Sequence, residues 1–303
     1  MTINEVTRHN VTEQRIEQAL DDMAGRTFNR WHDMVWNPIP LRRGLRELGE
    51  ELADHLGART VSDPALHTPD SRTALLTAAE CALGVLSLAC FPDGDFEIPL
   101  PLATRTLSNQ DLHYEETYEP AHPPTTARTW TDAFQWSVIS GLIGHKDRFI
   151  GPMLLRDYAP AIREGVPYSE RESVSAPADL AEMDALCGYL DVPEDAHPSP
   201  APLAKPDAAH RTRTAQQLDA AGTLTPDQRL LRVLLDDDQA AFERALHDRL
   251  VAHRESVGAE PAAKSLLPVA AVTLAALAHT AHGWQLHVHS AYLPEALVNA
   301  PAQ

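Results

Sequence analysis

The sequence has few cysteines and glycines and lacks the motifs of common enzyme classes. Its three cysteines, Cys81, Cys90 and Cys187, are odd in number and have no metal-binding spacing, so we expect buried, reduced thiols. The 14 glycines form no phosphate-binding loop, and no G-x-S-x-G, H-E-x-x-H or C-x-x-C motif occurs. These absences disfavour an enzyme, and we predict no catalytic residue and no cofactor.

Positive charge is also scarce. The chain has 25 Lys and Arg against 43 Asp and Glu, which gives a formal net charge of −18. Because phosphates and anionic lipids repel such a chain, we expect neither nucleic acid nor a membrane as partner, and a basic protein is the natural counterpart. The same charge is also consistent with a role in solubility alone. No basic segment followed by an apolar one marks a secretory signal, so we expect a cytoplasmic protein.

Apolar periodicity predicts helices through most of the chain. Leucines recur at spacings of three and four from Leu41 to Leu56, and Gly57 is interpreted as the end of that helix. The preceding stretch 31–40, rich in tryptophan and proline, is assigned to a connection. Near the other end, Thr225 and Gln228 form a capping-box start for a further helix. With 44% hydrophobic residues, these helices can enclose a large core.

Two stretches are apolar on every side and predict buried core helices. The run 73–91 is nearly long enough to cross a bilayer, but Glu80 within it favours a core helix, in which this carboxylate must find a partner. The run 267–281 ends just before Gly283, as expected of a helix that stops at glycine. We predict an all-α fold of layered antiparallel helix pairs around this C-terminal helix, with at most a minor extended segment near 284–289.

The domain organisation follows from the breaks in this pattern. We expect one helical domain, 1–303, with sub-halves 1–128 and 129–303 as the alternative division. Prolines and acids dominate 92–128, and Pro, Ala, Asp and His dominate 193–210, so both stretches are predicted to be irregular connections. Long connections of this kind are often functional, which makes the acidic one a candidate contact surface.

Two polar clusters near the C-terminus invite a chemical interpretation. His279 and His282 share a helix face while His287 and His289 share a strand face, so three of them could converge on zinc. No carboxylate or cysteine lies within this cluster to complete a site, and we predict no metal. The acids at 236–238 precede a helix, where carboxylates satisfy free amides and complement the helix dipole.

Three groups of residues in the second half share their order and spacing with a known family. They are Phe242, Ala245, Leu246, Leu250 and His253; Leu267, Pro268, Val269 and Ala270; and Ser290, Ala291, Tyr292, Leu293 and Pro294. This set resembles the immunity 49 family of bacterial polymorphic-toxin immunity proteins, and the segment from Trp130 to Arg148 is similar to the family's central helical region. The sequence departs from the family at Ala291, where aspartate is common, and at Val257, where the family has an aromatic residue.

The resemblance implies an all-helical, cytoplasmic, non-enzymatic protein that binds and neutralises a cognate toxin. Families of this kind often face nucleases or nucleic-acid deaminases, whose clefts are basic. The charge of the chain agrees with this, and we expect acidic residues to occlude the catalytic cleft. The candidate contact residues are Asp93, Asp95, Glu97, Glu115, Glu116 and Glu119, together with Asp236, Asp237 and Asp238. Two other classes stay open: a helical scaffold for an unrelated partner and a metal-dependent enzyme that uses the C-terminal histidines.

Overall fold

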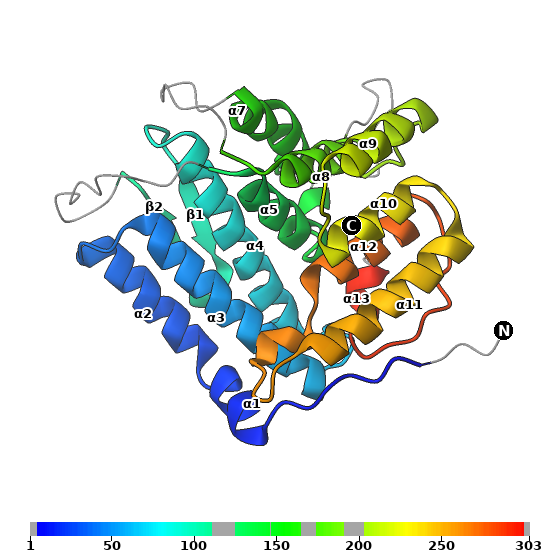
Figure 1. Ribbon diagram of the computed structural model, residues 1–303. Coiled ribbons are helices and arrows are strands. Elements are labelled where there is room, and N and C mark those ends of the chain that lie inside the picture. The colour runs from blue at the N-terminus through cyan, green and yellow to red at the C-terminus, as the bar shows by residue number, and fades with distance from the viewer. Residues whose placement is uncertain (1–4, 111–124, 146, 165–173, 191–202, 300–303) are drawn as a thin grey trace.

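Helices form most of the computed structural model, which describes residues 5–110, 125–145, 147–164, 174–190 and 203–299. The α-helices are α1 Glu13–Leu20, α2 Met23–Trp36, α3 Leu41–Ser62, α4 Pro69–Cys90, α5 Ala127–Ile139, α6 Ile150–Met153, α7 Ala159–Glu164, α8 Pro177–Cys187, α9 Ala208–Ala220, α10 Pro226–Leu235, α11 Gln239–Ser256, α12 Val269–Thr280 and α13 Glu295–Val298 (Figure 1). Short 3-10 or π turns occupy Pro101–Ala103 (η1), Leu142–Gly144 (η2), Leu154–Tyr158 (η3) and Ala263–Leu266 (η4). The all-α prediction is confirmed.

Helix α4 lies at the centre of the N-terminal half, between α3 and α5 (Figure 1). It begins with Thr68, whose side chain accepts a hydrogen bond from the Ser71 amide, and with Pro69 in the first turn. By length and composition, Pro69–Cys90 and Ala263–Thr280 could each cross a membrane, but 83% and 67% of these windows are buried inside the protein. Both predicted core helices therefore supply the core of the fold, which also buries all three cysteines.

Glu80 on α4 has the partner that its burial requires. The guanidinium of Arg148 donates to both carboxylate oxygens of Glu80, at 2.8 and 2.9 Å. Desolvation nevertheless raises the pKa of Glu80 above its ordinary value, against the opposing effect of Arg148. The effect of desolvation on the carboxylate is therefore larger than the opposing effect of the ion pair. The ion pair connects α4 to the segment after α5.

The structure corrects several predicted boundaries. Helix α3 continues through Gly57 to Ser62, and a side chain at Gly57 would lie 2.1 Å from the Ala263 carbonyl oxygen. Gly57 therefore permits the close approach of η4 and does not end a helix. The stretch 31–40, assigned to a connection, instead lies partly in α2, which extends to Trp36.

The irregular connection predicted after α4 contains a hairpin. Strands β1 (Glu97–Leu100) and β2 (Arg105–Ser108) pair antiparallel, with Ile98 opposite Leu107, and both of these side chains are buried. Alternating apolar residues are typical of strands, but the prolines and acids on either side favoured the prediction of an irregular connection. In contrast, 284–289 forms no strand, and the only bridge in that part of the described chain joins Val6 to Ser290.

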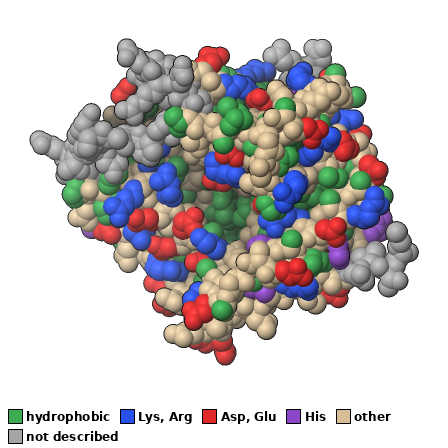
Figure 2. Space-filling model, in the orientation of Figure 1, with side chains coloured by type: hydrophobic (Ala, Val, Ile, Leu, Met, Phe, Trp, Pro, Cys, Tyr) green, Lys and Arg blue, Asp and Glu red, His purple; other side chains and the backbone are tan. Residues whose placement is uncertain are grey.

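The C-terminal half packs against the N-terminal half through one continuous hydrophobic cluster. Its predicted capping box is present, since Thr225 and Gln228 exchange side-chain to backbone hydrogen bonds at the start of α10. Residues Ala271 to Ala278 of α12 are all buried. On the face of the molecule shown in Figure 2, a hollow with hydrophobic side chains at its bottom lies between the two halves, with charged side chains around it.

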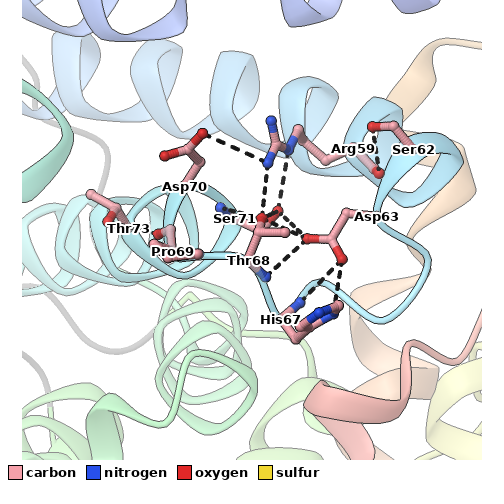
Figure 3. Close-up of polar contacts among 9 residues, drawn as sticks. All are labelled: Arg59, Ser62, Asp63, His67, Thr68, Pro69, Asp70, Ser71 and Thr73. Atoms are coloured by element: carbon pink, nitrogen blue, oxygen red, sulfur yellow. Dashed lines mark hydrogen bonds and ion pairs between the residues drawn. The ribbon is translucent and has the colours of Figure 1, made fainter.

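The turn between α3 and α4 is fixed by a hydrogen-bonded carboxylate (Figure 3). Asp63 accepts from the hydroxyls of Thr68 and Ser71, both at 2.7 Å, and from the amides of Thr68 and His67 at 3.1 and 3.3 Å. Burial alone would raise its pKa, but these donors lower the pKa of Asp63 to about 2. The network therefore holds the antiparallel geometry of α3 and α4 through one ionised group.

We predict that an Arg148→Met substitution lowers the free energy of unfolding by about 2–4 kcal/mol, because it leaves the Glu80 carboxylate buried without a partner. Urea unfolding at pH 7 measures the change. The matched control is the double variant Glu80→Leu/Arg148→Met, which removes both charges and is expected to recover most of the loss. A loss below about 1 kcal/mol in the single variant would contradict this account of the pair.

We predict that Asp63→Asn lowers the free energy of unfolding by about 2 kcal/mol at pH 7, the equivalent of a pKa lowered from 3.8 to about 2. The folded-state pKa is below the unfolded one, so this stabilisation is present above pH 3.8 and is lost as the pH falls towards 2. The difference in the free energy of unfolding between the parent protein and the Asp63→Asn variant should therefore become smaller in acid. Asp70→Asn, at a side chain that is 84% exposed, is the control and should change stability by less than about 0.5 kcal/mol.

Candidate functional site

Two of the predicted contact residues line a surface cavity of about 470 Å³. Asp93 and Asp95 lie in the turn that follows α4, and Asp157 joins them from η3. The complete lining is Phe91, Asp93, Gly94, Asp95, Phe96, Met153, Asp157 and Tyr158. We call this site the acidic pocket. Asp157 was missed from the sequence because only the fold brings η3 next to the turn.

The wall of the acidic pocket is held by hydrogen bonds from the hairpin. The side chain of Asn109 accepts from the Phe96 amide at 2.8 Å and donates to the Gly94 carbonyl at 2.6 Å. On the other side, the ring of Phe91 packs 5.7 Å from that of Tyr158, whose hydroxyl shares a hydrogen bond with Ser87 of α4. The pocket is therefore preformed on the end of the core helix.

The acidic pocket has three carboxylates for which the described part of the chain provides no ion-pair partner. Asp93, Asp95 and Asp157 are exposed, and within the described residues none of them has a hydrogen bond or an ion pair. Aromatic rings lie beside them. A lysine or arginine side chain would place its charge among the carboxylates and its apolar stem or planar guanidinium against the rings. The chemistry of the pocket therefore suits a cationic side chain.

The other predicted acids of this connection extend the surface or lie outside the described part of the chain. Glu97 is exposed at the start of β1, and it follows directly after the pocket residue Phe96. Glu115, Glu116 and Glu119 lie outside the described residues. The structure thus gathers Asp93, Asp95 and Glu97 in one region.

The acids at 236–238 are engaged within the protein. Asp236 pairs with Arg232 at 2.5 Å, and Asp238 caps α11 by accepting from the Ala241 amide at 3.0 Å, as predicted for acids before a helix. Asp237 pairs with Lys205 at 2.5 Å and Arg211 at 3.1 Å. Toxin contact at Asp236, Asp237 and Asp238 stays a prediction.

The four C-terminal histidines bind separate partners. His279 contacts the Trp284 carbonyl, His287 contacts Glu243, and the backbone carbonyl of His289 accepts from the Val6 amide. His282 is buried between Asp237 at 3.0 Å and the Tyr189 hydroxyl at 2.9 Å. In the described part of the chain, no group of three or more His, Cys, Asp or Glu side chains is placed to hold a metal. The four histidines therefore make separate contacts, and within the described residues they form no converging ligand set for the metal-enzyme alternative.

A second polar cluster, which was not found from the sequence, lies among α5, α8 and α10. The side-chain amide of Gln228 donates to Asp179 and to Glu182, both at 2.9 Å, and Arg128 donates to Asp179 at 3.0 Å. Burial raises the pKa of Glu182 to about 7, although Gln228 and Arg128 oppose the shift. No spacing motif relates Arg128 and Gln228 to the two acids of α8, because the cluster joins three helices that are distant in the sequence.

We predict that stability falls between pH 7 and pH 5 in part through His282. Burial lowers its pKa, against the opposing effect of Asp237. Because the folded-state pKa is below the unfolded one, the stability contribution is present above pH 6.5 and is lost as the pH falls through the folded value. The His282→Gln variant should lose less stability over this range in urea titrations, whereas the exposed control His289→Gln should follow the parent protein. Equal slopes for all three proteins would refute the assignment.

Most of the chain matches one known family model. Residues 63–297, about three quarters of the chain, match the family model described as Immunity protein 49. No curated protein and no solved structure gives a significant match. The matched region contains the acidic pocket and both core helices, while α1, α2 and α3 precede it. Immunity families are typically non-enzymatic inhibitors, and membership implies a cognate toxin that is neutralised. The chain belongs to the immunity protein 49 family.

Proposed function

We propose that this protein neutralises its toxin in the cytoplasm by docking the acidic pocket and Glu97 against a basic catalytic cleft, of the kind found in nucleases and nucleic-acid deaminases. The observation that carries the proposal is the set of three carboxylates, Asp93, Asp95 and Asp157, which have no partner among the described residues and line an aromatic cavity. A cleft that binds nucleic acid presents lysine and arginine side chains to phosphate. The same side chains suit this pocket.

Electrostatics supports recognition of a basic partner at this position. Complementary charge raises the association rate and suppresses wrong partners, and a net charge of −18 provides a long-range field. A long-range field alone gives no orientation. Carboxylates that already pair with arginine, such as Glu80 and Asp236, contribute little to the attraction of a basic partner. Unpaired acids beside a preformed cavity direct the field to one place on the surface.

The proposal predicts a loss of binding that depends on where the charge is changed. The triple variant Asp93→Lys/Asp95→Lys/Asp157→Lys should slow association with the cognate toxin by at least about tenfold and abolish protection in co-expression. The salt dependence of the association rate should fall as well, because fewer opposite charges attract. Stopped-flow or surface-based kinetics at several salt concentrations provide the measurement.

The matched control changes the net charge by the same amount elsewhere. Glu13, Glu17 and Asp248 are exposed residues on α1 and α11, so the triple variant Glu13→Lys/Glu17→Lys/Asp248→Lys tests net charge alone. We expect it to keep protection and to change the association rate by less than about threefold. Equal loss in both triple variants, or retained protection in the pocket variant, would show that the pocket is not the contact surface.

A further inference from the structure

A second surface cavity has a positive lining, in contrast to the acidic pocket. Its volume is about 330 Å³, and it lies where α8 contacts both α7 and α9 (Figure 1). Its polar lining residues are Arg163 of α7, Asp184 of α8, and His210, Arg213, Thr214 and Gln217 of α9. Two arginines against one aspartate make this lining positive, in a chain whose net charge is −18. We call this site the arginine pocket.

The single carboxylate of the arginine pocket is already engaged. Nε of Arg163 donates to Oδ1 of Asp184 at 2.7 Å, and Nη2 of Arg163 lies 2.6 Å from the same oxygen. The two opposite charges therefore compensate each other within the wall of the pocket. Arg213 is exposed, and no carboxylate of the described residues forms an ion pair with it. Its charge is thus available to a ligand.

Arg213 contacts a histidine and thereby fixes the position of the imidazole proton. Nη2 of Arg213 lies 2.8 Å from Nδ1 of His210, three residues earlier on α9. Because an arginine side chain can only donate, Nδ1 accepts, and the imidazole carries its proton on Nε2. Nε2 is shielded from solvent and has no hydrogen-bond partner among the described residues. The wall of the arginine pocket therefore includes a buried N–H donor that the described part of the chain does not satisfy.

The imidazole of His210 is held in place by its surroundings. A Cβ atom at Gly188 would lie 2.4 Å from Nε2 of His210, so any other residue at this position would require the ring to move. The backbone amide of His210 donates to the carboxylate of Asp207, which caps α9, at 2.7 Å. The donors of the arginine pocket are thus positioned before any ligand arrives, which reduces the entropic cost of binding.

We propose that the arginine pocket binds a small molecule through an oxyanion, the charged group of a phosphate or a carboxylate. The planar fork of a guanidinium matches two oxygens of such a group, and Arg213 has no carboxylate partner of its own. Nε2 of His210 is a donor that requires an acceptor, and Gln217, one helical turn after Arg213, adds a side-chain amide. A cation would find no available carboxylate in this lining.

The size of the cavity favours a small molecule over a segment of protein. Pockets for small ligands have volumes of about 300–1,000 Å³, and the arginine pocket lies near the lower end of that range. The inference goes beyond the proposed function and does not depend on the toxin, because His210 and Arg213 do not line the acidic pocket.

Two minimal probes, inorganic phosphate and succinate, test the inference and distinguish the two kinds of oxyanion. Each is titrated separately into the full chain at pH 7, with chloride holding the ionic strength constant, and backbone amide shifts are followed by NMR. We expect at least one probe to give saturable shifts centred on residues 184–188 and 208–217, with a Kd below about 5 mM. No saturation with either probe by about 50 mM, or shifts centred elsewhere, would overturn the inference.

Substitutions on α9 test whether the named donors bind the probe. Arg213→Gln changes an exposed side chain and should weaken binding of the saturating probe by at least about tenfold. His210→Ala removes the Nε2 donor and should weaken it by at least about threefold. The matched control Arg244→Gln removes one charge from an exposed position on α11 and should bind within about twofold of the parent protein.

The outcomes of these titrations are independent of toxin binding. Parent affinity in Arg213→Gln, or an equal loss in Arg213→Gln and Arg244→Gln, would show that the arginine pocket is not the binding site and would refute the inference. Because the toxin is absent from the assay, either result leaves the acidic pocket untouched. Conversely, retained protection in the triple variant of the acidic pocket would refute the proposed function and leave the arginine pocket unaffected.

Discussion

Helix α4 has to be buried on every side, and the rest of the structure depends on this constraint. Helices α3 and α5 cover it, and Arg148 reaches it from the segment after α5 to neutralise Glu80. The Asp63 network fixes the angle at which the chain enters α4. At its other end, the chain turns at Phe91, and the hairpin folds back to form the wall of the acidic pocket. The acidic pocket therefore begins where the core helix ends.

The fold was predictable where a local pattern determines local structure. The capping box at Thr225 and the apolar run that forms α12 depend on neighbours within a few residues, and both are present. The prediction that a helix ends at Gly57 was wrong because glycine occurs in two kinds of position. It is common at the ends of helices, and it also occurs where another backbone approaches closely. Only the position of η4, which is more than 200 residues away along the chain, decides between them.

The candidate site was predictable in part. Asp93, Asp95 and Glu97 were found because acids between prolines indicate an exposed connection, but their unpaired state is a property of the fold. Asp157 gave no signal, since it lies in a helical segment with no neighbouring motif. The C-terminal histidines gave a misleading sequence signal. Their closeness in sequence suggested convergence, whereas the chain directs each to a different partner.

A net charge of −18 does not describe the surface that a partner meets. Acids that cap helices or pair with arginine serve the fold, and what remains is a small set of available carboxylates placed in concave surroundings. Membership of the immunity protein 49 family implies a toxin, and we propose that these carboxylates form its contact surface. Hydrogen exchange of the toxin complex tests this claim most directly. The account predicts new protection at residues 91–98 and 153–158, with little change at 236–238. Protection confined to the corner at 236–238, or to α1 and α2, would contradict it.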